Sequence, residues 1–142
     1  MADGGRIREL RMRRGLLQRE LAEMAGVTES AVRNYELGLR TPRPRHLEAL
    51  AKALGVDSAA LVDYGLETAR DALEVLFRLE ENFGARPETD AGGVRIIVNP
   101  STPGAQKLDA AVRAWAAMRA RVDSGEISDE EYLDWKRGFG GR

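Results

Sequence analysis

Apolar residues in the first 65 positions recur every three or four residues and are interrupted by glycines, a pattern that predicts several short helices. The helices expected from this spacing cover approximately residues 7–14, 18–25, 29–37, 44–54 and 57–64. Gly26 permits a sharp turn between the second and third, because glycine adopts positive φ without steric cost. Thr28 suits the N-cap of the third. These residues therefore predict a compact, five-helix, all-α domain over residues 1–65.

Residues 66–142 predict a mostly helical C-terminal region with one short strand. A long helix is expected over 67–83, a flexible connector over 84–93, and two further helices after Thr102 and Ser128. The β-branched run 94–98 is the only strand that the pattern predicts. Because one strand is not stable alone, it needs a partner. We favour a second copy of the strand across a two-fold axis; a segment of a target protein, or an extended loop laid on the helices, stays open.

The second and third predicted helices, joined by a short turn, have the arrangement of a helix-turn-helix. The third helix has an apolar stripe, and its other face carries four polar residues: Glu29, Ser30, Arg33 and Asn34. Arginine reads guanine, asparagine reads adenine, and glutamate accepts from cytosine, so the four form a candidate base-reading set. A polar outer face is also the ordinary pattern of any surface helix. For the helix taken alone, the ordinary solvent-exposed face is the favoured interpretation.

Charge is distributed unevenly along the chain, although the total is only −1. Residues 1–45 hold ten arginines and six acidic residues, a net charge of +4, so residues 46–142 carry −5. A basic first part suits phosphate contact, and arginine is better suited than lysine to bidentate contacts. The pattern indicates a basic binding module attached to a region with another task.

The segment from Ile7 to Leu61 resembles the Cro/phage-repressor (Xre) helix-turn-helix family. The matching positions are Leu10-Arg11, Gly15-Leu16, Gln18, Glu20-Leu21-Ala22, Gly26-Val27-Thr28, Val32, Glu36, Gly38, Pro42 or Pro44, Leu47, Leu50-Ala51 and Leu54-Gly55-Val56. The resemblance covers about two-fifths of the chain and implies double-stranded DNA binding through the major groove.

The resemblance also implies a role for particular residues. It places Glu29, Ser30, Arg33 and Asn34 at base edges. The residues expected at phosphates are Gln18, Thr28, Arg40, Thr41, Arg43 and Arg45. Arg11 and Glu36 match a family pair that forms an internal salt bridge and orients the third helix.

Two residues depart from the family pattern. Leu17 stands where Ser or Thr usually caps the second helix, so that cap is weaker or comes from elsewhere. Glu29 places a negative charge toward the groove. It either meets a cytosine amine or pairs with Arg33 four residues on, and the two interpretations are equally favoured.

Nothing in the sequence indicates an enzyme, a metal site or a cofactor. His46 is the only histidine and there is no cysteine, which excludes disulfides and cysteine-rich zinc sites. The N-terminus lacks the apolar core of a signal peptide, and no apolar run approaches the ~20 residues of a membrane helix. We expect a cytoplasmic protein without membrane contact.

The sequence thus predicts a dimeric transcriptional repressor that reads a palindromic operator, with 1–65 binding DNA and 66–142 forming the dimer. An antitoxin-like protein, whose C-terminal half binds a partner protein while the N-terminal domain regulates its own operon, is the alternative. A small-molecule effector at the C-terminal half also stays open. Loss of DNA binding, with the fold used for protein interaction alone, is disfavoured by the arginines.

Overall fold

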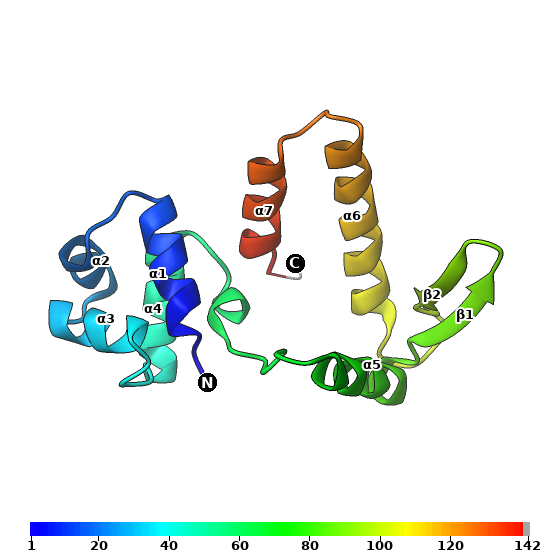
Figure 1. Ribbon diagram of the computed structural model, residues 1–142, viewed down its shortest axis with the longest axis horizontal. Helices are drawn as coiled ribbons and strands as arrows, with labels where there is room; N and C mark the ends of the chain where they lie inside the picture. The colour runs from blue at the N-terminus through cyan, green and yellow to red at the C-terminus, as the bar shows by residue number, and fades with distance from the viewer. Residues whose placement is uncertain (141–142) are drawn as a thin grey trace. The chain divides into compact units, whose positions relative to one another are not determined.

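The computed structural model describes residues 1–140 and is mainly helical, as expected (Figure 1). Its elements are α1 (Gly4–Arg13), α2 (Gln18–Ala25), α3 (Glu29–Glu36), α4 (Pro44–Leu54), the 3₁₀ helix η1 (Ser58–Leu61), α5 (Ala69–Phe83), β1 (Arg86–Asp90), β2 (Gly93–Ile97), α6 (Gln106–Asp123) and α7 (Asp129–Gly138). The predicted repressor-type helical domain, followed by a mostly helical region, is confirmed. Across residues 1–140, no helix is both long and apolar enough to cross a membrane.

The first of two compact units contains Met1–Tyr64 together with Leu133–Gly140. Its core is formed by the apolar stripes of α1 to α4 and η1. The largest fully buried side chains are Ile7, Leu21, Val32, Leu50 and Leu61. Burial of each such side chain is worth about 1.5–3 kcal/mol. This core fixes the position of α3 relative to α1, α2 and α4.

The second half of α7 packs within this first unit. Asp134 pairs with Arg13 of α1 at 2.8 Å, and Arg137 lies 3.6 Å from Glu9. The backbone N–H of Asp57 donates to the carbonyl of Arg137 at 3.0 Å. Residues near the end of the chain therefore support the side of the first unit formed by α1 and η1.

The second unit, Gly65–Tyr132, contains α5, an antiparallel hairpin and α6. In it Arg86 pairs with Ile97 and Asp90 with Gly93. The expected flexible connector over 84–93 is therefore wrong, because most of it forms β1. The expectation that the strand finds its partner in a second copy is also wrong: β2 pairs with β1 of the same chain.

Three helix boundaries differ from the expected ones. The fifth helix is only the 3₁₀ turn η1, capped by the side chain of Asp57. The long helix begins at Ala69, because Thr68 and Asp71 form its capping box. The helix expected directly after Thr102 begins at Gln106, since Gly104 has a φ of 82° and interrupts it. The box at Ser128 and Glu131 before α7 is confirmed.

Candidate nucleic-acid interface

Helix α3 is supported by α2 and a three-residue turn. Gly26 ends α2 with a φ of 68°, a left-handed conformation that favours glycine. The side chain of Thr28 accepts a hydrogen bond from the N–H of Ala31 at 3.0 Å and caps α3. Ala31, Val32 and Tyr35 are buried beneath the helix. One face of α3 is therefore fixed inward and the other is left to solvent.

The candidate base-reading residues lie on that outward face. Glu29, Ser30 and Arg33 are exposed and Asn34 is half-buried. The backbone carbonyl oxygen of Asn34 accepts hydrogen bonds from the backbone N–H groups of Leu39 and Arg40, at 2.9 and 3.3 Å. These bonds connect the end of α3 to the following loop. The structure thus brings the four residues together on an eight-residue helix.

The charged groups of Glu29 and Arg33 form no ion pair with each other within residues 1–140. Of the two interpretations of Glu29, pairing with Arg33 thus finds no support in this conformation. Both groups are left available to a ligand.

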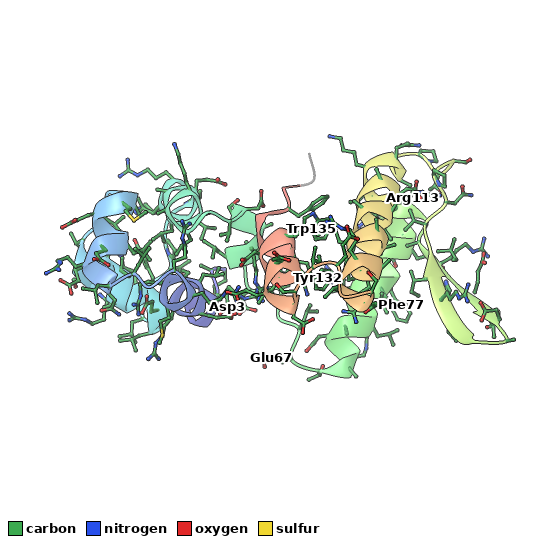
Figure 2. The ribbon with its side chains drawn as sticks, turned by 90° about the horizontal axis from the view of Figure 1, so that it is seen from above. Asp3, Glu67, Phe77, Arg113, Tyr132 and Trp135 are labelled. Atoms are coloured by element: carbon green, nitrogen blue, oxygen red, sulfur yellow. The ribbon has the colours of Figure 1, made fainter. Side chains whose placement is uncertain are left out.

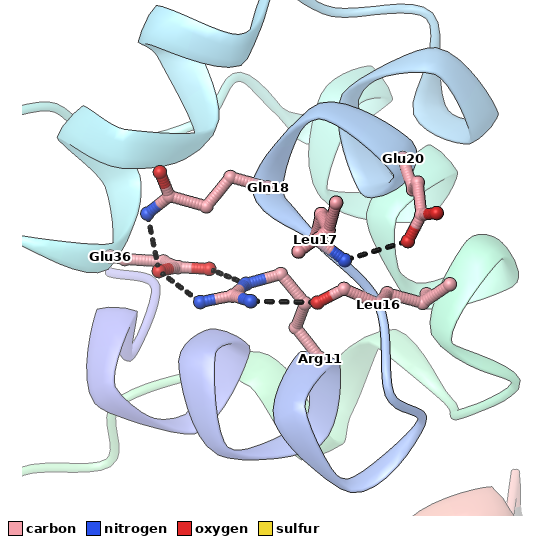
Figure 3. A network of polar contacts seen from close by, with 6 residues as sticks. All are labelled: Arg11, Leu16, Leu17, Gln18, Glu20 and Glu36. Atoms are coloured by element: carbon pink, nitrogen blue, oxygen red, sulfur yellow. Dashed lines mark hydrogen bonds and ion pairs between the residues drawn. The ribbon is translucent and has the colours of Figure 1, made fainter.

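A polar network beneath the interface joins α1, α2 and α3 (Figure 3). The guanidinium of Arg11 donates to both carboxylate oxygens of Glu36, at 2.5 and 3.1 Å, and to the carbonyl of Leu16 at 2.7 Å. The Arg11 side chain is only 12% exposed and that of Glu36 3%. Hydrogen bonding to Glu36 raises the pKa of Arg11, so the guanidinium stays charged. The pair expected from the sequence is thus present at the last residue of α3.

Gln18 takes part in the same network. Its Nε2 donates to Glu36 at 2.9 Å (Figure 3). An amide nitrogen carries two N–H groups, so one remains for the phosphate contact expected of Gln18. Gln18 is also the first residue of α2, where unpaired backbone N–H groups attract anions. No sequence pattern indicates the contact with Glu36, which lies 18 positions away.

The cap of α2 comes from Glu20 rather than from residue 17. Leu17 has no side-chain acceptor, but the carboxylate of Glu20 accepts from the backbone N–H of Leu17 at 2.8 Å. One of the unpaired N–H groups at this end of α2 is thereby satisfied. The departure at Leu17 therefore weakens the cap without removing it.

The candidate phosphate contacts after α3 lie on a loop with a buried proline and on the first turn of α4. Pro42 is buried and Pro44 occupies the first position of α4. Around them the side chains of four residues are exposed: Arg40, Thr41, Arg43 and Arg45. Arg40 also lies over the ring of Tyr35, 6.0 Å from its centroid. The loop therefore presents the guanidinium groups of Arg40 and Arg43, and the first turn of α4 presents that of Arg45.

His46 has a structural contact that sequence reasoning missed. Its Nδ1 lies 3.4 Å from the hydroxyl of Tyr35, and the ring is half-buried. This joins the first turn of α4 to the buried side of α3. A histidine eleven residues from a tyrosine gives no local signal of such a contact.

A short helix with an exposed polar face, a supporting helix before it, and arginines flanking one end together define a helix-turn-helix DNA-binding protein. The class follows from the arrangement of α2 and α3 rather than from any single residue.

Comparison with known proteins agrees with this class. Residues 7–61 match the family described as helix-turn-helix. A cryptic phage CTXphi transcriptional repressor, RstR of Vibrio cholerae, is 34% identical over 86 residues, which are 61% of this chain and 77% of RstR. A solved SinR protein/SinI protein complex contains a chain with 33% identity and a TM-score of 0.43, covering 58% of this chain and 82% of that one. The chain belongs to the Cro/phage-repressor (Xre) helix-turn-helix family, whose members are DNA-binding transcriptional regulators.

Proposed function

We propose that this protein is a transcriptional repressor that binds a palindromic operator as a homodimer. In this proposal residues 1–65 bind double-stranded DNA and residues 66–142 hold the dimer together. The observation that carries it is the outward face of α3, where Glu29 and Arg33 are exposed and form no ion pair within residues 1–140. Repression is proposed because RstR is named a transcriptional repressor.

Base discrimination is assigned to the outward face of α3. Arg33 presents the donors that recognise guanine, and Asn34 can recognise adenine. Glu29 would accept from the amino group of cytosine, and its charge would be repelled by a misplaced phosphate. Ser30 is small and can donate or accept. A helix fixed at one end by Thr28 and at the other by Glu36 would hold these groups in register.

Affinity is assigned to the flanking cations and to the start of α2. Arg40, Arg43 and Arg45 would neutralise phosphates on one side, with Thr41 donating a hydrogen bond. Gln18 and the N-terminus of α2 would contact phosphate on the other. Thr28 is exposed as well as capping α3, so its side chain can approach the DNA backbone. These contacts carry no sequence information but set the position of α3 in the groove.

The two-fold operator follows from dimerisation. Two copies related by a two-fold axis place their α3 helices in successive major grooves, about 34 Å apart. The half-sites should therefore form an imperfect palindrome with centres one helical turn apart. A single unrepeated site in a footprint would contradict this part of the proposal.

The test is selection of binding sites from a pool of random duplexes with the purified full chain, followed by titration across a salt series. We expect one enriched palindrome, bound at least a thousandfold more tightly than a scrambled duplex. The log–log salt slope should be near −0.9 for each phosphate contacted. Equal binding to all duplexes, or none at low salt, would refute sequence-specific DNA binding.

A further inference from the structure

The second unit has almost no core of its own. Across residues 65–132 the buried side chains are those of Ala85, Ala105 and Tyr132, and no Leu, Ile, Val or Phe in this stretch is buried. Tyr132, which Figure 2 labels, accepts a hydrogen bond at its hydroxyl from the indole N–H of Trp115 at 2.6 Å. Ordering each residue costs about 1–2 kcal/mol of backbone entropy, which apolar burial has to offset. Other apolar side chains of this stretch, such as Leu79, Phe83 and Val112, are only half-buried, so the second unit has much less apolar burial to offset this cost than the first unit has.

Helix α5 carries an apolar surface far wider than a surface helix needs. The α5 apolar arc consists of Ala69, Ala72, Leu73, Val75, Leu76, Phe77, Leu79 and Phe83. At 3.6 residues per turn it spans about 200°, against about 100° for a helix that covers a core with one face, and the exposed Glu80 is the one charged residue within it. Leu73, Leu76 and Phe77 are 40–46% exposed. Within residues 1–140, no other helix or strand packs extensively against α5.

The opposite side of α5 is polar and internally paired. Arg70 and Arg78 both contact Glu74, at 3.0 and 3.2 Å. Glu81 lies on the same side and is exposed. This side is therefore satisfied in water, and the need for a partner is confined to the apolar arc.

The hairpin has an exposed apolar face of its own. Its register places Pro87 opposite Ile96 and Thr89 opposite Val94, so these four residues share one side, the hairpin apolar face. Val94 is 69% exposed and Ile96 46%. The other side is mostly charged, with Arg95 and Asp90 paired at 2.8 Å. A two-stranded hairpin is marginally stable in water unless one side is covered.

We propose that the α5 apolar arc and the hairpin apolar face are covered by the same surfaces of a second copy of this chain. Together these two surfaces hold six large apolar side chains that are each 39–69% exposed: Leu73, Val75, Leu76, Phe77, Val94 and Ile96. An interface of the standard ~800 Å² per partner is large enough to cover such a set. In a single chain the second unit has almost no core. The partner that covers its apolar surfaces must therefore be bound permanently. A second copy meets that condition, and a two-fold contact covers both copies with one self-complementary surface.

This inference rests on the proposed function, because it names the surface that makes the repressor a dimer. The polar side of α5 lies outside the proposed dimer interface. Folding of residues 65–132 is coupled to dimerisation. Separated chains should lose helical structure in that unit while the first unit, which has its own core, stays folded.

Cross-linking tests the interface directly, because the chain contains no cysteine. Single-cysteine chains Leu76→Cys, Val94→Cys and, as control, Glu81→Cys would be treated with a short bis-maleimide at low micromolar concentration. We expect covalent dimers at least tenfold more abundant for the first two chains than for the control. Equal yields for all three chains, or no dimer for the first two, would overturn the assignment.

Sedimentation velocity of Leu76→Lys and Glu81→Lys gives a second measurement without DNA. Leu76→Lys should weaken the dimer at least a hundredfold, with a fall in helicity below the dissociation midpoint, and Glu81→Lys should change the dissociation constant less than threefold. A wild-type chain that sediments as a fully helical monomer would refute the proposal. Since neither assay contains DNA, a failure here is distinct from a failure of operator binding.

Discussion

Replacing Glu36 by glutamine tests whether the buried network holds the DNA-binding unit together. The substitution keeps the shape of the side chain but removes the charge that faces Arg11, whose side chain is 12% exposed. Arg11 would keep the carbonyl of Leu16, but the single amide oxygen of the glutamine could replace only one of the two carboxylate oxygens, so an amide NH2 would face either Nε of Arg11 or the donors of Arg11 and Gln18. The guanidinium would then be buried without a counter-charge.

The expected loss is about 3–5 kcal/mol, the range for removing one partner of a buried pair. Domains of this size have about 5–15 kcal/mol of stability, so the first unit should become marginal. The melting temperature should fall by roughly 12 °C or more, at about 4 °C per kcal/mol. Because Glu36 is the last residue of α3, specific DNA binding should weaken with it.

The assay is urea denaturation followed by far-ultraviolet circular dichroism, with Asp123→Asn as the matched control. Asp123 pairs with Arg119 at 2.9 Å, but both side chains are more than half exposed. An exposed pair at this spacing contributes at most about 0.5 kcal/mol. If Glu36→Gln costs less than about 1 kcal/mol, or no more than the control, the network is not a main source of the domain's stability.

Three further predictions concern other parts of the molecule. Arg33→Ala should reduce discrimination at one base pair by about 1–3 kcal/mol, whereas Arg43→Ala should weaken binding to specific and random duplexes by the same factor. If both variants lost affinity equally for the two kinds of duplex in a filter-binding titration, this division of roles would be wrong. Gly26→Ala should cost about 1–2 kcal/mol in urea denaturation, because φ is 68° there, and an unchanged midpoint would show that the strain is relieved. Hydrogen bonds from Thr68 lower the pKa of Asp71 below 3.8, so the contribution of its charge to stability is present above that pH and lost as the pH falls through the lower folded value. Thr68→Ala removes the hydroxyl and keeps the backbone N–H, so it should return the pKa of Asp71 part of the way toward 3.8 in a carboxyl NMR titration, and an unaltered pKa would remove the Thr68 hydroxyl as a cause.

The sequence predicts the first unit well because its signals are local. Apolar spacing places the buried faces of the helices, Gly26 marks the turn, and Thr28 marks the start of α3. Each of these depends on residues within one or two turns of helix. The outward face of α3 is the complement of its buried stripe, so the apolar spacing alone is enough to assign the candidate base-reading residues to that face.

The hairpin could not be predicted in the same way. β1 contains a proline and three charged residues, types that are depleted in strands, and all five of its residues are exposed. Only the partner strand β2 has β-branched residues in succession. The loop of Ala91 and Gly92 was the one available signal, and its composition also suits a flexible connector.

Contacts across the first unit were also beyond sequence reasoning. Gln18 meets Glu36, and Tyr35 meets His46, only because α2, α3 and α4 pack around one core. No spacing rule connects such positions. Arg11 and Glu36, 25 residues apart, were anticipated only through the family resemblance, which shows that tertiary pairs need information from outside a single sequence.

The contacts that hold helix α3 in place do not involve the side chains of Glu29, Ser30 or Arg33. Thr28 fixes its first turn, Glu36 its last residue, and Ala31, Val32 and Tyr35 its inner side. Substitutions at Glu29, Ser30 or Arg33 should therefore leave folding almost unchanged while they alter the preferred DNA sequence. Operator preference could then drift rapidly between related repressors without passing through unstable intermediates. The same property makes α3 a suitable helix on which to redesign specificity.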